Sequence, residues 1–397
     1  MTLPPLSLYV HLPWCVSKCP YCDFNSHGLK GTLPEAAYLD ALLRDLDQDL
    51  PRAQGREILT VFFGGGTPSL FSAAGIERFL DGVRRRLPLA SEAEITLEAN
   101  PGTVERGRFA EYRAAGVTRL SIGVQSFEPE HLRALGRIHS CDEAVRAAEE
   151  AHAAGLANFN LDLMYGLPGQ SLEQAKADVR RAAALAPAHL SHYQLTLEPN
   201  TLFHAHPPTL PEDETIWAMQ LECQAALAER GYLQYEISAY ARPGHECRHN
   251  LNYWRFGDYL GLGAGAHGKL TDASGRVTRL WKLKHPESYL QKAGTPAALG
   301  GVDAVGAADL TFEFMLNRLR LLEAFGAEDF EAATGLPRGA LAPGLTRALS
   351  LELVESVPEG WRVTRRGHNY LNDLQALFLP EQRLPDRDAG SPLRAYS

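Results

Sequence analysis

Residues 6–22 read LSLYVHLPWCVSKCPYC, a short apolar strand pattern that runs directly into a loop with three cysteines. The spacing is Cys15-x3-Cys19-x2-Cys22, so half of the six cysteines of this 397-residue chain lie in one short segment. Clustered thiols in a chain without an export signal indicate a metal site or catalysis rather than disulfide bonds. The stretch therefore predicts a soft-metal site directly after the first strand.

The residues alone leave three interpretations of this cluster. An iron–sulfur cluster with three protein ligands would leave one iron open to a small molecule. Zinc would need a fourth ligand, such as His11 or His27. Packing as small core residues is the third interpretation, which a loop with a lysine and two prolines disfavours.

Composition excludes several classes of protein. Hydrophobic residues make up 45% and charged residues 22% of the chain, as in soluble globular proteins, and the length predicts two domains. The longest apolar runs are strand-sized, so membrane contact is expected to be at most peripheral. The N-terminus lacks the pattern of a secretory signal, which predicts a cytoplasmic protein. A net charge of −9 provides no reason to bind nucleic acid.

Six short β-branched or aromatic runs recur in the first half of the chain, and a helix-like stretch follows most of them. The runs begin at Leu6, Ile58, Glu94, Thr118, Asn158 and His189. Amphipathic stretches such as residues 34–50 and 171–186 open with proline or serine, which is typical of helix N-termini. Strands that alternate with helices predict a parallel sheet with functional residues at the carboxyl ends of the strands. The pattern fits both a partial barrel and an open doubly wound sheet.

The rhythm changes after Pro199, and the remaining chain divides into two parts and a tail. A helix near residues 212–230 and a glycine-rich stretch at 256–268 lie in a connecting segment, residues 201–305. Residues 306–380 contain three helical stretches, two short strands and a final helix, which predicts a winged-helix-like domain. Its mixed acidic and basic side chains favour a packing or lid role over DNA binding. Residues 381–397 are polar and are expected to form a loose tail.

Two further features follow the predicted strands. The second strand ends in GGGTPS at residues 64–69, where the backbone could approach a ligand and offer amide hydrogens, or simply form a tight turn. Later strands end in Glu98, Gln125 and Asp162, and Arg137 follows in LGRIHS. A single acid at a strand end is commonly a helix cap. Polar groups on successive strand ends converge on one edge, however, which favours a ligand with hydroxyl, ammonium or carboxylate groups.

The motif CVSKCPYC resembles the signature of the radical S-adenosylmethionine superfamily. The resemblance implies a 4Fe-4S cluster on Cys15, Cys19 and Cys22, with S-adenosylmethionine on the open iron. In that superfamily the reduced cluster cleaves the cofactor to a 5′-deoxyadenosyl radical, which requires an electron donor. The resemblance places these residues around S-adenosylmethionine: Tyr9, Tyr21, Gly65, Gly66, Thr67, Glu98, Gln125, Arg137 and Asp162.

The segments GVQSF, DLMYGLPGQ and LTLEPNT are similar to those of the oxygen-independent coproporphyrinogen oxidase branch, over nearly all of residues 6–380. This resemblance implies an α/β fold, a six-unit partial (β/α) barrel over residues 1–200, with the C-terminal winged-helix-like domain. Oxidases of this branch have a fourth cysteine two residues after the third and a longer segment before the cluster. Here that position is Phe24, which cannot ligate iron. Both departures match the sister group, the radical-SAM heme chaperones, which bind heme and deliver it to hemoproteins.

The segment RHNLNYW, residues 248–254, resembles the H-N-x-x-Y-W motif of the chaperone group. The resemblance implies a heme-related role, with His249 as a candidate axial ligand and two aromatic residues against the porphyrin. From the residues alone, a histidine beside aromatic residues is more often part of the core. Cys247 is a second candidate ligand, although Cys141, Cys223 and Cys247 are expected to be packing residues.

Two classes of function follow from these resemblances. The first is a heme chaperone that contains the cluster and S-adenosylmethionine, and whose partners are heme, acceptor hemoproteins and an electron donor. The second is an oxygen-independent coproporphyrinogen III oxidase, a radical enzyme that decarboxylates porphyrinogen propionates. Because the oxidase needs an additional acid or thiol on the substrate side and none is evident, the chaperone without oxidase activity is favoured.

Overall fold

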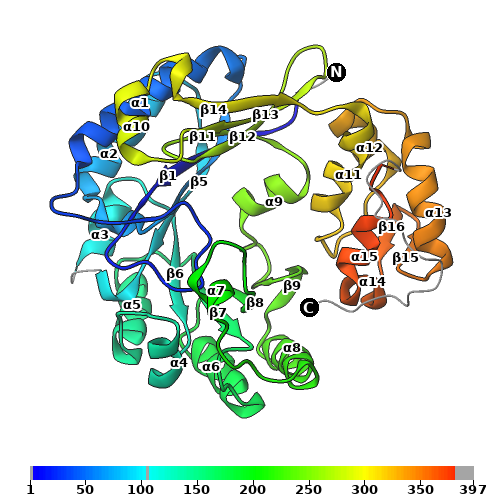
Figure 1. Cartoon of the computed structure of the whole chain (residues 1–397), viewed down its shortest axis with the longest axis horizontal. Coiled ribbons are helices and arrows are strands. Elements are labelled where there is room, and N and C mark those ends of the chain that lie inside the picture. Colours follow the sequence, from blue (N-terminus) through cyan, green and yellow to red (C-terminus); the bar gives the residue numbers. More distant parts are fainter. Residues whose placement is uncertain (1–2, 104–106, 381–397) are drawn as a thin grey trace.

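The chain folds around one twelve-stranded sheet, of which six parallel strands form the wall of an open barrel (Figure 1). This computed structural model describes residues 3–103 and 107–380. The six strands occur in chain order in the sheet. They are β1 (Leu6–Leu12), β4 (Ile58–Gly65), β5 (Leu89–Ala99), β6 (Arg119–Gln125), β7 (Phe159–Tyr165) and β8 (His189–Gln194). All six predicted strands are confirmed.

Helices cover the convex side of this wall, as Figure 1 shows. They are α1 (Glu35–Ala53), α2 (Ala73–Arg84), α3 (Arg108–Ala114), α4 (Pro129–Ala134), α5 (Cys141–Ala153) and α6 (Leu172–Ala184). The predicted serine start of α6 is confirmed, because the Ser171 hydroxyl accepts a hydrogen bond from the Gln174 amide. Helices on one side of a curved sheet define a partial barrel and exclude the doubly wound alternative.

The barrel strands alternate in polarity because their two faces meet different surroundings. In β1, Leu8 and Val10 belong to the hydrophobic core. Ser7 and Tyr9, at the alternate positions, point to the other face, since successive side chains of a strand alternate. The same alternation places Glu94, Thr96 and Glu98 of β5, and Asn160 and Asp162 of β7, on the concave face. The interior of the barrel is therefore polar, which suits a ligand site better than a packed core.

Residues 201–305 extend the same sheet at both edges. At one edge β8 is followed by β10 (Ala239–Ala241) and β9 (Leu233–Glu236). At the other, β11 (Asp258–Leu262) runs parallel to β1, and β12 (His267–Thr271), β13 (Val277–Lys282) and β14 (Leu299–Ala304) follow antiparallel. The helices of this segment are α7 (Leu202–Ala205), α8 (Asp213–Ala228), α9 (Arg248–Trp254) and α10 (Pro286–Lys292). Helix α9 lies inside the arc of the sheet, against β1 and β4 (Figure 1).

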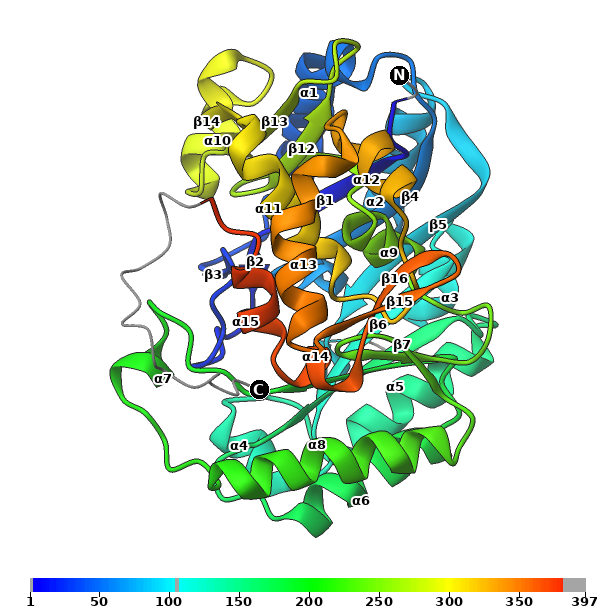
Figure 2. The same cartoon turned by 90° about the vertical axis from the view of Figure 1, so that its right-hand side faces the viewer.

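The C-terminal part forms a separate helical layer beside the barrel opening (Figure 2). It contains α11 (Ala307–Arg318), α12 (Ala327–Thr334), α13 (Ala342–Ser350), the hairpin β15 (Val354–Val357) and β16 (Gly360–Val363), α14 (Arg365–Asn369) and α15 (Leu371–Ala376). A second hydrophobic core, which includes Phe314, Phe330 and Leu374, holds these elements together. The predicted winged-helix-like domain is thereby confirmed. The predicted tail, residues 381–397, lies outside the described residues.

No helix among the described residues is long and apolar enough to cross a bilayer.

Candidate functional site

The cysteine loop is anchored at both ends beside the glycine loop. Short strands β2 (Trp14–Cys15) and β3 (His27–Gly28) pair with each other and enclose the loop. Leu12 pairs with Gly65, so the two loops start side by side at the carboxyl ends of β1 and β4. Cys15 is buried, whereas Cys19 and Cys22 are half-exposed. The structure thus brings all three predicted thiols to the predicted edge of the sheet.

The surroundings of His11 do not support the zinc interpretation. Its Nε2 lies 2.9 Å from the Asn25 carbonyl oxygen, and its Nδ1 lies 3.0 Å from the Tyr9 hydroxyl, so both ring nitrogens are occupied. Nowhere in residues 3–103 and 107–380 are three His, Cys, Asp or Glu side chains arranged to hold a single metal ion. A four-iron cluster holds its thiolate ligands on separate irons, so it does not need the sulfurs to converge on one point.

The glycine loop packs directly against the cysteine loop. A side chain at Gly66 would lie 2.5 Å from the Trp14 carbonyl oxygen, so only glycine fits there. The Gly66 and Thr67 amides donate to the Leu12 and Trp14 carbonyls at 2.8 and 2.7 Å. The Gly65 amide donates to Glu98 at 3.1 Å. All three amides are therefore used within the protein, as in the tight-turn alternative, and are not free for a ligand in this structure.

Two buried carboxyl groups, Glu98 and Asp162, lie on the concave face of β5 and β7. Burial, together with the nearby charge of Asp162, raises the pKa of Glu98 to about 8. Burial also raises the pKa of Asp162, although hydrogen bonds from Asn160 and Ser121 partly stabilise its charged form. Two buried carboxyl groups whose ionisation is disfavoured are suited to a cationic ligand, which would lower both pKa values.

The remaining predicted residues surround the same space. Gln125 has a φ of 68°, a left-handed conformation that is costly for a residue with a side chain, and its Oε1 accepts from Tyr193 at 2.8 Å. Arg137 donates to the Gly123 carbonyl at 2.6 Å and lies 3.7 Å from the Cys19 sulfur. Tyr21 also lies near the Cys19 sulfur and Arg137. The structure therefore gathers the cysteines and the predicted cofactor residues at one end of the barrel.

A polar network that the sequence analysis missed lies beneath these residues. Asn160 Nδ2 donates to Asp162 at 2.8 Å, and Asn160 Oδ1 lies 2.7 Å from His189 Nδ1. His189 Nε2 lies 2.8 Å from the Tyr235 hydroxyl, which accepts from the Cys247 amide at 3.2 Å. A continuous chain of hydrogen bonds thus connects the cofactor end of the barrel with the start of α9. The sequence does contain a signal for this network, namely polar residues at every second position of the strands.

His249 occupies the core rather than an open site. Its Nδ1 lies 2.7 Å from the Thr60 hydroxyl and its Nε2 lies 2.8 Å from the Tyr253 hydroxyl, and only 1% of the residue is exposed. Burial lowers the pKa of His249 to about 3. The neighbouring Cys247 is also fully buried, with its sulfur 3.7 Å from Glu94. Both ring nitrogens of His249 are therefore engaged within the protein, as in a core histidine, and neither is free to bind iron in this arrangement.

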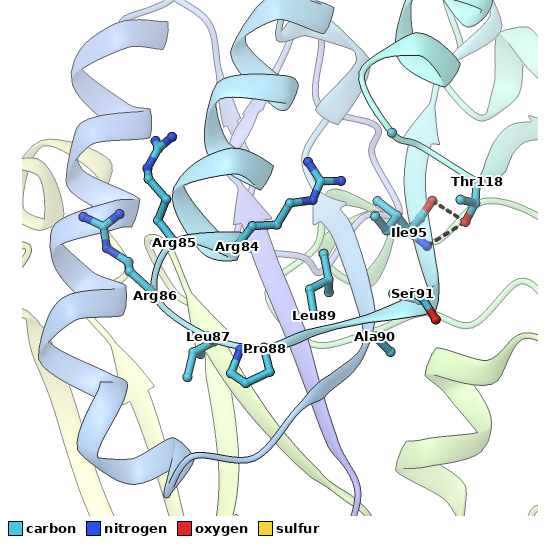
Figure 3. A pocket seen from close by; sticks show the side chains of 12 residues that line it. Arg84, Arg85, Arg86, Leu87, Pro88, Leu89, Ala90, Ser91, Ile95 and Thr118 are labelled. Carbon is cyan, nitrogen blue, oxygen red and sulfur yellow. Dashed lines mark hydrogen bonds between the residues drawn. The ribbon is translucent and has the colours of Figure 1, made fainter.

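A cavity lies away from this site. About 620 Å³ in volume, it is lined by a run of three arginines and by the first residues of β5, at the amino ends of the strands (Figure 3). Arg84 pairs with Asp81, and Arg86 pairs with Asp47 through two hydrogen bonds. Two of its three cations are therefore neutralised by the protein itself, and none of the predicted site residues lines this cavity.

Comparison with known proteins defines the class and then the family. The Radical SAM superfamily model matches residues 9–182, and the HemN C-terminal domain model matches residues 306–368. The solved structure of the radical SAM enzyme coproporphyrinogen III oxidase (HemN) from Escherichia coli superimposes with a TM-score of 0.80 at 26% identity, covering 95% of this chain and 90% of that one. Together with the partial barrel and its cysteine loop, these matches define a radical SAM protein with a HemN-type C-terminal domain.

Curated relatives narrow the assignment. The heme chaperone HemW of Escherichia coli is 55% identical, and that of Haemophilus influenzae 49% identical, each over 96% of this chain and 99% of the relative. The heme chaperone HemW of Bacillus subtilis is 31% identical over 94% of this chain and 99% of the relative. The chain belongs to the heme chaperone HemW family.

Proposed function

We propose that this chain binds a 4Fe-4S cluster, S-adenosylmethionine and heme, and delivers the heme to acceptor hemoproteins. The observation that carries the proposal is the 55% identity with the heme chaperone HemW of Escherichia coli over nearly the whole of both chains. Acceptor hemoproteins and an electron donor for the cluster are the expected protein partners, and the cytoplasm is the expected location.

The donor set fits the two cofactors. Cys15, Cys19 and Cys22 would hold the cluster, because three thiols on one anchored loop leave a fourth iron position for another ligand. Glu98 and Asp162 would face the cationic part of S-adenosylmethionine, since both carboxyl pKa values are raised in its absence. When bound, the cluster supplies one electron to S-adenosylmethionine, which is the chemistry that the superfamily shares.

The other residues at this end have positioning roles in the proposal. Arg137 would stabilise the negative charge of the cluster ligand Cys19 and bind a carboxylate through its remaining donors. Gln125 and Tyr193 would fix the polar wall opposite the cysteine loop. The space in between would be shaped by Tyr9, Tyr21, Gly65, Gly66 and Thr67. If the glycine loop contacts an ammonium group, it would do so through its carbonyl oxygens.

Anaerobic reconstitution followed by heme titration, with a parallel assay of coproporphyrinogen conversion, tests this function. We expect heme binding and no conversion, even with S-adenosylmethionine and a reductant present. The oxidase is the second candidate because the HemN fold covers 95% of the chain. Conversion well above a cluster-free control would overturn the chaperone proposal, and transfer of bound heme to an apo-hemoprotein would support it.

A further inference from the structure

The rim of the cysteine loop offers the heme ligand that the barrel interior lacks. We propose that heme binds at a rim site made of Lys18, Phe24, His27, Lys284 and His285, with His285 as the iron ligand and His27 as its close neighbour. This inference rests on the proposed function, since it names the place at which the cargo binds.

The rim site is held together by contacts between segments that are distant in the sequence. Asn25 of the cysteine loop donates to the carbonyls of Ala264 and Lys284 at 2.9 and 2.8 Å. These bonds fasten the loop to the segment that begins α10. As a result, the rings of His27 and His285 lie with their centroids 6.0 Å apart and nearly perpendicular. Two imidazoles therefore stand together beside the cysteine loop.

His285 has the properties that an axial ligand requires. It is exposed at the N-cap of α10, and its ring forms no hydrogen bond with any residue that the structure describes. An imidazole with a free nitrogen at the surface can reach the iron of a bound heme, as buried His249 cannot. His27 is half-buried, its Nε2 lies 3.3 Å from the Asn25 side-chain oxygen, and its ring also interacts with the Lys284 backbone.

The neighbouring side chains match the rest of the heme molecule. Phe24 is 59% exposed and Val16 52% exposed, so the cysteine loop presents apolar surface that would be covered by a porphyrin face. Lys18 and Lys284 are exposed and form no ion pair with the described residues. Lys18 Nζ donates to the Phe24 and Ser26 carbonyls at 3.1 and 3.4 Å. Two unpaired ammonium groups beside an apolar surface suit the two propionates of heme.

This site also accounts for the phenylalanine in the cysteine loop. Phe24 occupies the position at which the oxidases have their fourth cysteine, and most of the residue is exposed. An exposed phenyl group is unfavourable in water unless a ligand covers it. A porphyrin in contact with Phe24 would provide that cover.

Heme titration of the reconstituted full-length chain, followed by absorbance, tests the rim site. We expect the double variant His27→Ala/His285→Ala to weaken heme binding about 10- to 100-fold and to change the Soret spectrum, with partial recovery on addition of free imidazole. Phe24→Ser should weaken binding several-fold without changing the ligand spectrum. Iron content and thermal unfolding should stay close to wild type, because Phe24 and His285 are exposed and His27 is only half-buried.

Three controls decide the outcome. His152→Ala removes an exposed imidazole of α5 and should change nothing. His249→Phe should leave heme affinity unchanged, and His267→Ala, at a nearby exposed imidazole, should leave the spectrum unchanged. Retained affinity and spectrum in the double variant, or loss of the spectrum in either His249→Phe or His267→Ala, would overturn the rim site. A wild-type chain that bound no heme would contradict the proposed function itself, and the rim site with it.

Discussion

The two ends of the barrel are built from the same strands but treat their polar side chains in opposite ways. At the amino end, His249 uses both ring nitrogens, and Glu94 accepts from the amides of Arg248 and His249 at 3.3 and 3.0 Å. At the carboxyl end, burial raises the pKa of both Glu98 and Asp162, and the charge of Asp162 adds to the rise for Glu98. Within the described part of the chain, Nε of Arg137 has no hydrogen-bond partner.

The fold thus separates polar groups with a structural role from polar groups that are available for binding. Polar groups that have hydrogen-bond partners within the protein fix the position of α9 and reduce the stability of the fold little. Buried groups that lack partners, or that have the same charge as a neighbour, destabilise the fold until a ligand binds. The carboxyl end therefore has the character of a cofactor site and the amino end that of a closed support. Four measurements test this distinction.

The largest expected effect is at the cysteine loop. Replacement of Cys15, Cys19 and Cys22 by alanine should abolish iron binding, because no other thiol lies in the loop. Iron analysis after anaerobic reconstitution should fall from about four irons per chain to background. Cys141→Ala, at the surface end of α5, is the matched control and should retain full iron content. Iron retained in the triple variant would show that these three cysteines do not hold a cluster at the carboxyl end of the barrel.

At the amino end of the barrel, a substitution should lower the free energy of unfolding rather than cofactor binding. Glu94→Ala removes the acceptor for the start of α9 and leaves the buried charge of Arg119 without one of its counter-charges. We expect a loss of about 3–5 kcal/mol in the free energy of unfolding, measured by denaturant titration. Glu92→Ala, at an exposed position two residues earlier, should cost less than about 0.5 kcal/mol. Equal effects of the two variants would show that α9 is not held by Glu94.

At the carboxyl end, Asp162→Asn should weaken S-adenosylmethionine binding without loss of the cluster. A hydrogen bond or ion pair to a charged group contributes about 1.5–3 kcal/mol, so calorimetry should show roughly a ten- to hundredfold weaker affinity. Asn preserves the volume of the side chain, so the packing in β7 should be kept. Unchanged affinity, with iron content also unchanged, would assign Asp162 to the supporting network alone.

The smallest effect concerns pH. Because burial raises the pKa of Glu98 to about 8, the group is mostly neutral at pH 7 without ligand. A cationic ligand favours the ionised form, so binding should release a proton, and affinity should rise with pH up to about 8, by at most about tenfold per pH unit. Calorimetry in buffers of different ionisation enthalpy measures the released proton. Glu98→Gln should abolish this Glu98 contribution, and an identical pH slope in the variant would refute it.

Local sequence was sufficient for much of this molecule. The strand at residues 6–12 and the helix opened by Ser171 follow from periodicity and capping, which act between residues close in the chain. The spacing of Cys15, Cys19 and Cys22 predicts their common site for the same reason, since a single loop places all three. Glu98 and Asp162 were found because parallel strands end at one edge of a sheet.

Contacts between distant segments decided the rest. His249 and His285 are both histidines at the start of short helices, and no local pattern distinguishes them. Thr60 and Tyr253 close around the first, whereas the second is left exposed beside His27. Whether a polar side chain is satisfied or available depends on which segment covers it. That covering is set by packing across the whole chain, and a single sequence encodes it only through the complete fold.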